Sequence, residues 1–97
     1  VLLNNGMFGT IRMHQEREFP TQVSGTQLRN PDFCALARAY GYAAEKVTET
    51  AQFEAALLRA LAADTGTLIE IPLDPEVITT RGTLSSITQA AQARQAK

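Results

Sequence analysis

The chain has 97 residues, 44% of them hydrophobic and 20% charged, with a formal net charge of −1. A chain of this length forms one domain or part of one. Its charge excludes the strongly basic surface used to bind nucleic acid or an anionic membrane, and no apolar run reaches membrane-spanning length. One cysteine, Cys34, excludes an internal disulfide and indicates a cytoplasmic protein. We expect Cys34 to be a small buried hydrophobe.

The first segment reads as a strand, a turn and a helix. Val1 to Leu3 is a short apolar run of the kind found in strands buried in a parallel sheet, and Asn4-Asn5-Gly6 is a strong turn signal. Residues 7–18 then follow a helical pattern, with Gly6 and Gly9 at its entry, where close backbone approach or unusual dihedral angles are useful. Because the chain opens in mid-strand, we expect it to be cut from a longer protein.

The middle of the chain predicts a surface loop and a well-delimited helix. Residues 19–29 are irregular and polar, which indicates the loop. Asn30 is the expected helix N-cap, with Pro31 at the first helical position, and Gly41 is the expected C-terminal cap. The apolar stripe of this helix should comprise Phe33, Leu36, Ala37 and Tyr40.

A second helix and two strands complete the ordered part. We expect a brief strand near Lys46-Val47, a helix capped by Thr48 or Thr50 that runs to Ala63, and a strand over residues 67–71. The buried stripe of this helix should comprise Phe53, Ala56, Leu57, Ala60 and Leu61. Strands that alternate with helices predict an α/β fold with a parallel sheet flanked by helices. After Pro75 the core signals fade, and residues 84–97 form at most a weakly amphipathic helix through Leu84, Ile87 and Ala91.

The turn after the first strand has the residue types that a magnesium-bound diphosphate needs. Magnesium prefers hard oxygen ligands, and ligands collect at the carboxyl edge of a parallel sheet. The side-chain oxygen of Asn5 and the carbonyl of Met7 can supply two ligands, and the backbone amides near Gly9 and Thr10 can face phosphate at the start of a helix. Asn-Asn-Gly taken alone is a weak signal and favours a plain strand-ending turn over a metal site.

The longer string from Asn4 to Glu16, NNGMFGTIRMHQE, resembles the stretch that ends the thiamine-diphosphate motif in acetolactate-synthase-like enzymes. The likeness continues through residues 25–33, Leu36-Ala37, Gly41 and Ile69-Glu70-Ile71. It implies that residues 1–78 are the C-terminal part of a thiamine-diphosphate-binding domain. Residues 79–97 would then be a polar C-terminal tail that can form a mobile helix.

The resemblance also implies residue roles. Asn5 would give its side-chain oxygen, and Met7 its backbone carbonyl, to Mg²⁺. Ile11 and His14 would line the substrate pocket, and no catalytic residue falls within the chain. The aspartate of an upstream Gly-Asp-Gly and the glutamate that activates the cofactor lie outside it, so the chain alone is expected to be inactive. The positions implied to bind the cofactor are Asn5, Gly6, Gly9, Thr10 and Ile11.

The implied parent enzyme is a transferase or lyase of the acetolactate-synthase-like type. It would decarboxylate a small 2-ketoacid, transfer the resulting carbanion to an acceptor carbonyl and act as a homo-oligomer. Ile11 stands where the pyruvate-decarboxylase branch carries an acidic residue, which disfavours that branch. His14 stands where some acetohydroxyacid synthases carry the tryptophan that selects the acceptor, which weakens the case for synthase specificity. A non-oxidative 2-ketoacid decarboxylase or carboligase is therefore an alternative, as is a non-catalytic α/β module. An open sheet edge also predicts self-association of the isolated chain.

Overall fold

The computed structural model describes residues 1–97, which form two compact units. The sheet unit comprises Val1–Asn4 and Asn30–Leu73, and the helix unit comprises Asn5–Arg29 and Asp74–Lys97. Each unit is therefore assembled from two separate stretches of the chain. None of the chain's helices combines the length and the hydropathy of a membrane-spanning segment.

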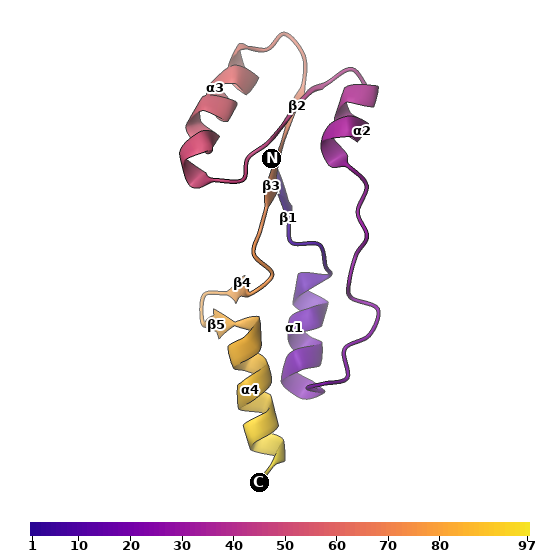
Figure 1. Ribbon diagram of the computed structural model, residues 1–97, viewed down its shortest axis with the longest axis vertical. Coiled ribbons are helices and arrows are strands. Elements are labelled where there is room, and N and C mark those ends of the chain that lie inside the picture. The colour runs from indigo at the N-terminus through magenta and orange to yellow at the C-terminus, as the bar shows by residue number, and fades with distance from the viewer. The chain divides into compact units, whose positions relative to one another are not determined.

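The sheet unit contains three parallel strands, as the order of elements predicts. The strands are β1 (Leu2–Asn4), β2 (Ala43–Lys46) and β3 (Thr67–Pro72), in the spatial order β1-β3-β2 (Figure 1). Helix α2 (Phe33–Ala39) precedes β2, whereas the 3-10 turn η1 (Thr50–Gln52) and helix α3 (Phe53–Ala62) connect β2 to β3. The predicted α/β class with a parallel sheet is confirmed.

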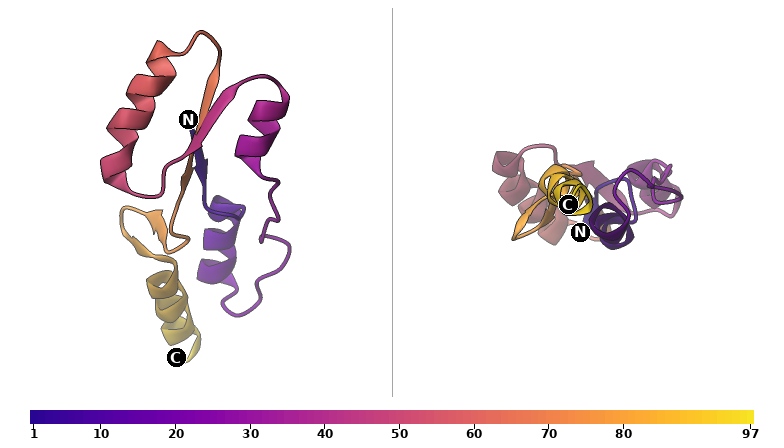
Figure 2. Two further views of the ribbon diagram at one scale, coloured as in Figure 1. Left: turned by 45° about the horizontal axis from the view of Figure 1, so that its top comes forward. Right: turned by 90° about the horizontal axis from the view of Figure 1, so that it is seen from below.

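Successive residues of the central strand β3 explain why the two helices cover opposite faces. Side chains alternate between the faces of a sheet. Ile69 packs with Val47 and Ala56 on the α3 side, whereas Glu70 lies beside Cys34 of α2. Figures 1 and 2 show α2 and α3 on either side of the strands.

The row of α3 that meets the sheet is narrower than predicted. Ala56 is fully buried, and Phe53 and Ala60 pack against the same cluster. Leu57 and Leu61 were predicted to be buried, but both are exposed, Leu61 to 74%. A helix that contacts one sheet face along a single row buries positions spaced by three and four residues, and it leaves the flanking leucines outside that contact.

The buried face of α2 is also displaced from the predicted stripe. Cys34 and Ala37 are buried, whereas Leu36 and Tyr40 are exposed. The burial of Cys34 confirms its predicted role as a small buried residue. Gly41 follows the helix with φ +81°, which is the backbone conformation expected of a C-terminal cap.

Three predicted positions in the sheet unit are wrong in detail. The N-cap of α2 is Asp32, whose carboxylate accepts the Ala35 N–H at 2.9 Å, while the Asn30 side chain donates to Asn4 Oδ1 at 2.9 Å. The cap of η1 is Glu49, not Thr48 or Thr50, because Gln52 completes a reciprocal capping box with it. Strand β2 ends at Lys46, so it lies earlier than the predicted Lys46-Val47.

A buried carboxylate lies between the sheet and α2. Glu70 is 4% exposed, accepts a hydrogen bond from Asn4 Nδ2 at 2.9 Å and lies 3.7 Å from Lys46 Nζ. The Cys34 thiol donates to the second Glu70 oxygen at 3.8 Å. Burial, with a smaller contribution from the Glu70 carboxylate, raises the pKa of the Cys34 thiol above its ordinary value of 9.0.

This raised pKa predicts that the sheet unit loses stability in alkali. Above pH 9.0 the thiol ionises in the unfolded chain but stays protonated in the folded one, so the free energy of unfolding falls as pH rises toward the folded pKa. Urea unfolding from neutral pH to above pH 9 will measure this fall. Cys34→Ala removes the group, so its curve should decline less. Parallel curves for the two proteins would contradict the assignment.

The helix unit contains two helices and a short hairpin. Helix α1 (Gly9–Glu18) lies beside helix α4 (Leu84–Gln95), and β4 (Val77–Thr79) pairs antiparallel with β5 (Gly82–Thr83) (Figure 1). Leu84 and Ala91 of α4 are buried, in line with the expected amphipathic pattern. The hairpin was not predicted, because strands of two and three residues carry no periodic signal.

Candidate functional site

A tight turn joins the end of β1 to the start of α1. The Asn5 side-chain oxygen accepts the Met7 backbone N–H at 3.2 Å, and Gly6 has φ +70°. The Gly6 carbonyl accepts hydrogen bonds from the Leu28 backbone N–H at 2.8 Å and from the Gln27 side chain at 3.2 Å. The loop before Asn30 therefore stabilises the turn through these two hydrogen bonds.

Gly9 allows the Asn5 side chain to lie against the first residue of α1. A Cβ atom at position 9 would meet Asn5 Nδ2 at 2.7 Å and Ile78 Cδ1 at 3.1 Å. The two glycines thus serve the two purposes expected from the sequence. Gly6 supplies the left-handed backbone conformation, and Gly9 supplies the close approach.

The start of α1 is open to an anion. No side chain caps it at Phe8, and its first intrahelical bond runs from the Arg12 N–H to the Phe8 carbonyl at 2.8 Å. The preceding helical amides carry the partial positive charge of a helix N-terminus. They border a pocket of about 290 Å³ lined by Met7, Phe8, Gly9, Thr10 and Ile11.

The donors of this turn fit a magnesium-bound diphosphate. An amide oxygen has two lone pairs, and the Asn5 oxygen uses one of them for the Met7 N–H. The second lone pair and the Met7 carbonyl offer two hard oxygens within one turn. Magnesium commonly takes a few protein oxygens and completes its octahedral shell with phosphate and water. The structure contains no group of three or more His, Cys, Asp or Glu residues that could hold a metal.

The predicted pocket residues lie on the first two turns of α1. Ile11 is 54% exposed, and His14 is exposed three residues further on, so both occupy one face of the helix. The His14 ring contacts the Arg17 guanidinium through Nδ1. The structure therefore brings Asn5, Gly6, Met7, Gly9, Thr10 and Ile11 together, and it places His14 next to them with its ring engaged by Arg17.

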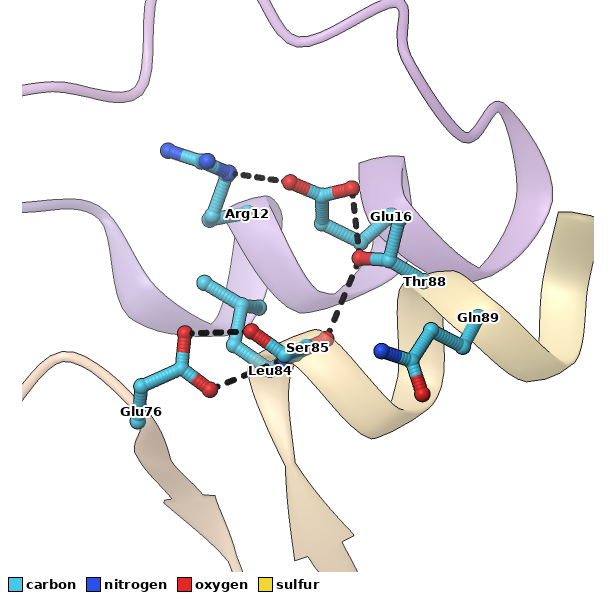
Figure 3. A pocket seen from close by; sticks show the side chains of 7 residues that line it. All are labelled: Arg12, Glu16, Glu76, Leu84, Ser85, Thr88 and Gln89. Atoms are coloured by element: carbon cyan, nitrogen blue, oxygen red, sulfur yellow. Dashed lines mark hydrogen bonds and ion pairs between the residues drawn. The ribbon is translucent and has the colours of Figure 1, made fainter.

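Sequence reasoning missed a buried polar cluster between α1 and α4. Glu16 is 6% exposed; one of its oxygens accepts Arg12 Nε at 2.9 Å and the other accepts the Thr88 hydroxyl at 2.8 Å (Figure 3). Glu76 accepts both the backbone N–H and the hydroxyl of Ser85, at 2.9 and 2.8 Å. These residues line a pocket of about 300 Å³.

This cluster binds α4 to α1. The spacing of Arg12 and Glu16 is visible in the sequence as an i, i+4 pair, whereas the contact with Thr88 spans 72 positions. Each carboxylate of the cluster is satisfied by donors of the same unit, and the bond between Glu16 and Thr88 joins the two helices.

Comparison with known proteins confirms the resemblance that the sequence suggests. Residues 1–71 match the family described as thiamine pyrophosphate enzyme, C-terminal TPP binding domain. Benzoylformate decarboxylase of Pseudomonas aeruginosa is 38% identical over 72 residues, which cover 74% of this chain and 14% of that protein. The large subunit of acetolactate synthase isozyme 2 of Escherichia coli is 39% identical over 75 residues, or 76% of the chain and 14% of that protein.

A third relative leads to the same family. The acetolactate synthase large subunit of Parasynechococcus marenigrum is 34% identical over 73 residues, which cover 73% of this chain and 12% of that protein. The chain thus spans only 12% to 14% of the length of these curated relatives. It belongs to the thiamine pyrophosphate enzyme family, through the C-terminal cofactor-binding domain that residues 1–71 match.

Proposed function

We propose that the chain is the C-terminal part of a thiamine-diphosphate- and Mg²⁺-dependent enzyme of the acetolactate-synthase-like type. The whole enzyme would decarboxylate a 2-ketoacid and join the remaining acyl unit to an acceptor carbonyl. Thiamine diphosphate supplies the electron sink for this chemistry when it is bound. The observation that carries the proposal is the Asn5 turn. It offers two hard oxygens, from the Asn5 side chain and the Met7 carbonyl, and it is followed directly by a helix start that no side chain caps. We assign residues 1–78 to the cofactor-binding domain and residues 79–97 to a polar tail.

Each residue of the turn has a distinct proposed role. Asn5 Oδ1 and the Met7 carbonyl would hold magnesium, and Gly6, with φ +70°, shapes the turn that carries both oxygens. Gly9 leaves room for the Asn5 side chain, as its close approach to Nδ2 supports. The backbone amides around Gly9 and Thr10 would hold the diphosphate, where the helix dipole favours negative charge. The side chains of Ile11 and His14 line the pocket for the 2-ketoacid.

A non-oxidative 2-ketoacid decarboxylase or carboligase is the second candidate. The 38% identity to benzoylformate decarboxylase supports it about as well as the 39% identity to an acetolactate synthase subunit supports the first. The two candidates share the cofactor and the metal and differ in the fate of the acyl unit. Product analysis of the whole enzyme with a 2-ketoacid, with and without an added acceptor, separates them.

The remaining ligands and the acid–base chemistry belong to parts of the enzyme outside this chain. We therefore propose that the chain alone is inactive and that the active form is a cytoplasmic homo-oligomer. Exposed apolar side chains, among them Leu3 and Tyr40, support association through surfaces of the sheet unit.

Replacing Asn5 tests the metal assignment. In the full-length enzyme, Asn5→Ala removes one oxygen ligand and should weaken Mg²⁺-dependent binding of thiamine diphosphate by at least about 100-fold. Loss of a residue that only hydrogen-bonds to a metal ligand already costs up to about 100-fold, so loss of a ligand itself should cost no less. Calorimetric titration measures the affinity. Gln92→Ala on the exposed surface of α4 shortens an amide side chain away from the turn and should bind normally. Equal affinities for wild type and Asn5→Ala would favour a turn with no metal-binding role.

A further inference from the structure

A third pocket of the helix unit differs in chemistry from the two described above. Its volume is about 310 Å³, and the residues that line it are Met13, Arg17, Thr79, Arg81 and Ile87. It shares no lining residue with the pocket beside the Asn5 turn or with the pocket around Glu16. We call it the arginine pocket, because its lining contains two arginines and no acidic residue.

Three elements of the helix unit form the arginine pocket. Met13 and Arg17 lie four residues apart on α1, so they occupy one face of that helix. Thr79 ends β4 and Arg81 follows in the turn before β5, whereas Ile87 belongs to α4. Helix α1 contacts both β4 and α4, which brings the three elements together (Figure 1).

The hairpin contributes two hydrogen-bond donors that the fold does not use. The Arg81 side chain is exposed, and its guanidinium donates to no group of the protein. The Arg81 backbone N–H donates to Thr79 Oγ1 at 3.3 Å, so this hydroxyl acts as an acceptor and still carries its own hydrogen. The guanidinium and the hydroxyl are therefore both available to a ligand in the pocket.

Arg17 adds a second positive charge at the other side of the pocket. Its Nε donates to Glu18 at 3.1 Å, and its guanidinium also contacts the His14 ring. The Glu18 side chain is 60% exposed, so water weakens this ion pair, and Glu18 does not line the pocket. Arg17 thus favours an anion in the pocket, while Arg81 is the guanidinium that is free to bind it.

Met13 and Ile87 give the pocket an apolar wall. Both side chains are half-buried, one on α1 and the other on α4. A small inorganic anion would leave this wall in contact with water, whereas a ligand with a hydrocarbon body would cover it. The planar fork of a guanidinium matches the two oxygens of a carboxylate. Charge and shape together therefore favour an anion that carries a hydrocarbon group.

From these features we propose that the arginine pocket binds a small aliphatic carboxylate. The carboxylate accepts hydrogen bonds from the Arg81 guanidinium and the Thr79 hydroxyl, and its hydrocarbon body packs on Met13 and Ile87. Binding is non-covalent and involves neither the Asn5 turn nor a metal. The site therefore goes beyond the proposed function and does not depend on it.

Nuclear magnetic resonance titration of the isotope-labelled chain tests the site with isocaproate, a branched aliphatic carboxylate. Saturable shifts should appear at the backbone amides of Thr79, Arg81 and Ile87. Acetate has the charge without the hydrocarbon body and should bind at least about tenfold more weakly, because each buried methylene contributes about 0.8 kcal/mol. Isohexanol has the body without the charge and should bind about fivefold more weakly, the upper range for an ion pair that stays open to solvent. Equal affinities for isocaproate and isohexanol would overturn the proposal.

Two arginine variants assign the binding to the pocket. Arg81→Gln keeps a long polar side chain without the charge and should weaken isocaproate binding about fivefold, which corresponds to about 1 kcal/mol. Arg29→Gln is the matched control, since Arg29 is an exposed arginine of the same unit that does not line the pocket, and it should bind normally. The dispersion of the amide signals shows in the same spectra that each variant is folded. Unchanged affinity in Arg81→Gln, or equal weakening in both variants, would contradict the assignment.

Discussion

Replacing Glu16 by leucine is expected to lower the free energy of unfolding by about 3 kcal/mol, the lower end of the cost of removing one partner from a buried ion pair. Leucine is close in size but leaves Arg12 Nε and the Thr88 hydroxyl without their acceptor. The lower end applies because the Arg12 side chain is 22% exposed and can regain some hydration. Urea unfolding followed by circular dichroism measures the change.

Two companion variants make this measurement specific. Glu18→Leu removes a carboxylate from the exposed end of the same helix, paired only with the neighbouring Arg17, and should change stability by less than about 0.5 kcal/mol. Thr88→Val deletes the hydroxyl and should cost about 1 kcal/mol, whereas Thr88→Ser should retain the bond. If Glu16→Leu were as stable as Glu18→Leu, the buried network would not hold α4 to α1.

Gly9→Ala is expected to disrupt the proposed metal site while leaving most of the fold intact. Its Cβ would lie 2.7 Å from Asn5 Nδ2, so the Asn5 side chain must move to accommodate it. Crowding of this kind costs about 1–3 kcal/mol in stability. In the full-length enzyme we expect Mg²⁺-dependent affinity for thiamine diphosphate to fall at least about tenfold. The reason is that Gly9 leaves room for the Asn5 side chain, and a displaced Asn5 would no longer present its oxygen to the metal.

A second glycine supplies the matched control for this variant. A Cβ at Gly82 would also meet a polar atom at 2.7 Å, but that atom is the Ser86 hydroxyl, away from Asn5. Gly82→Ala should therefore introduce similar crowding and leave cofactor affinity unchanged. Calorimetric titration of the two variants compares them directly. Equal affinities would mean that the position of the Asn5 side chain does not govern metal binding.

The parallel sheet could be predicted from the sequence, whereas several contacts within it could not. Short apolar runs alternating with helical patterns are local features, and they correctly placed the strand that ends at Asn4 and the strand at residues 67–71. Periodicity shows which residues share a face, but it does not show which row meets the sheet, so Leu36, Tyr40 and Leu61 were wrongly assigned to the core. Asn30 and Asp32 are both good helix caps, and only the three-dimensional path of the chain selects Asp32.

The candidate site was more predictable than the polar cluster around Glu16. Residues from Asn5 to His14 lie within one strand–turn–helix segment, so a single stretch of sequence contains the whole turn. Glu16 lies among charged and polar residues, a pattern typical of a solvated helix face. Its burial depends on contact with Thr88, which belongs to a segment without core signals. A buried carboxylate with a distant partner leaves no local pattern.

The interleaved layout of the two units has a consequence for how the protein is made. Residues 5–29 of the helix unit are synthesised well before residues 74–97, and the sheet-unit stretch from Asn30 to Leu73 emerges between them. While the sheet unit can already assemble, Glu16 of helix α1 has its Arg12 partner but still lacks Thr88. Contacts between residues so far apart in sequence form late, because they close the longest loops. The interval before α4 arrives is consequently the stage at which a nascent chain of this design most needs protection by chaperones.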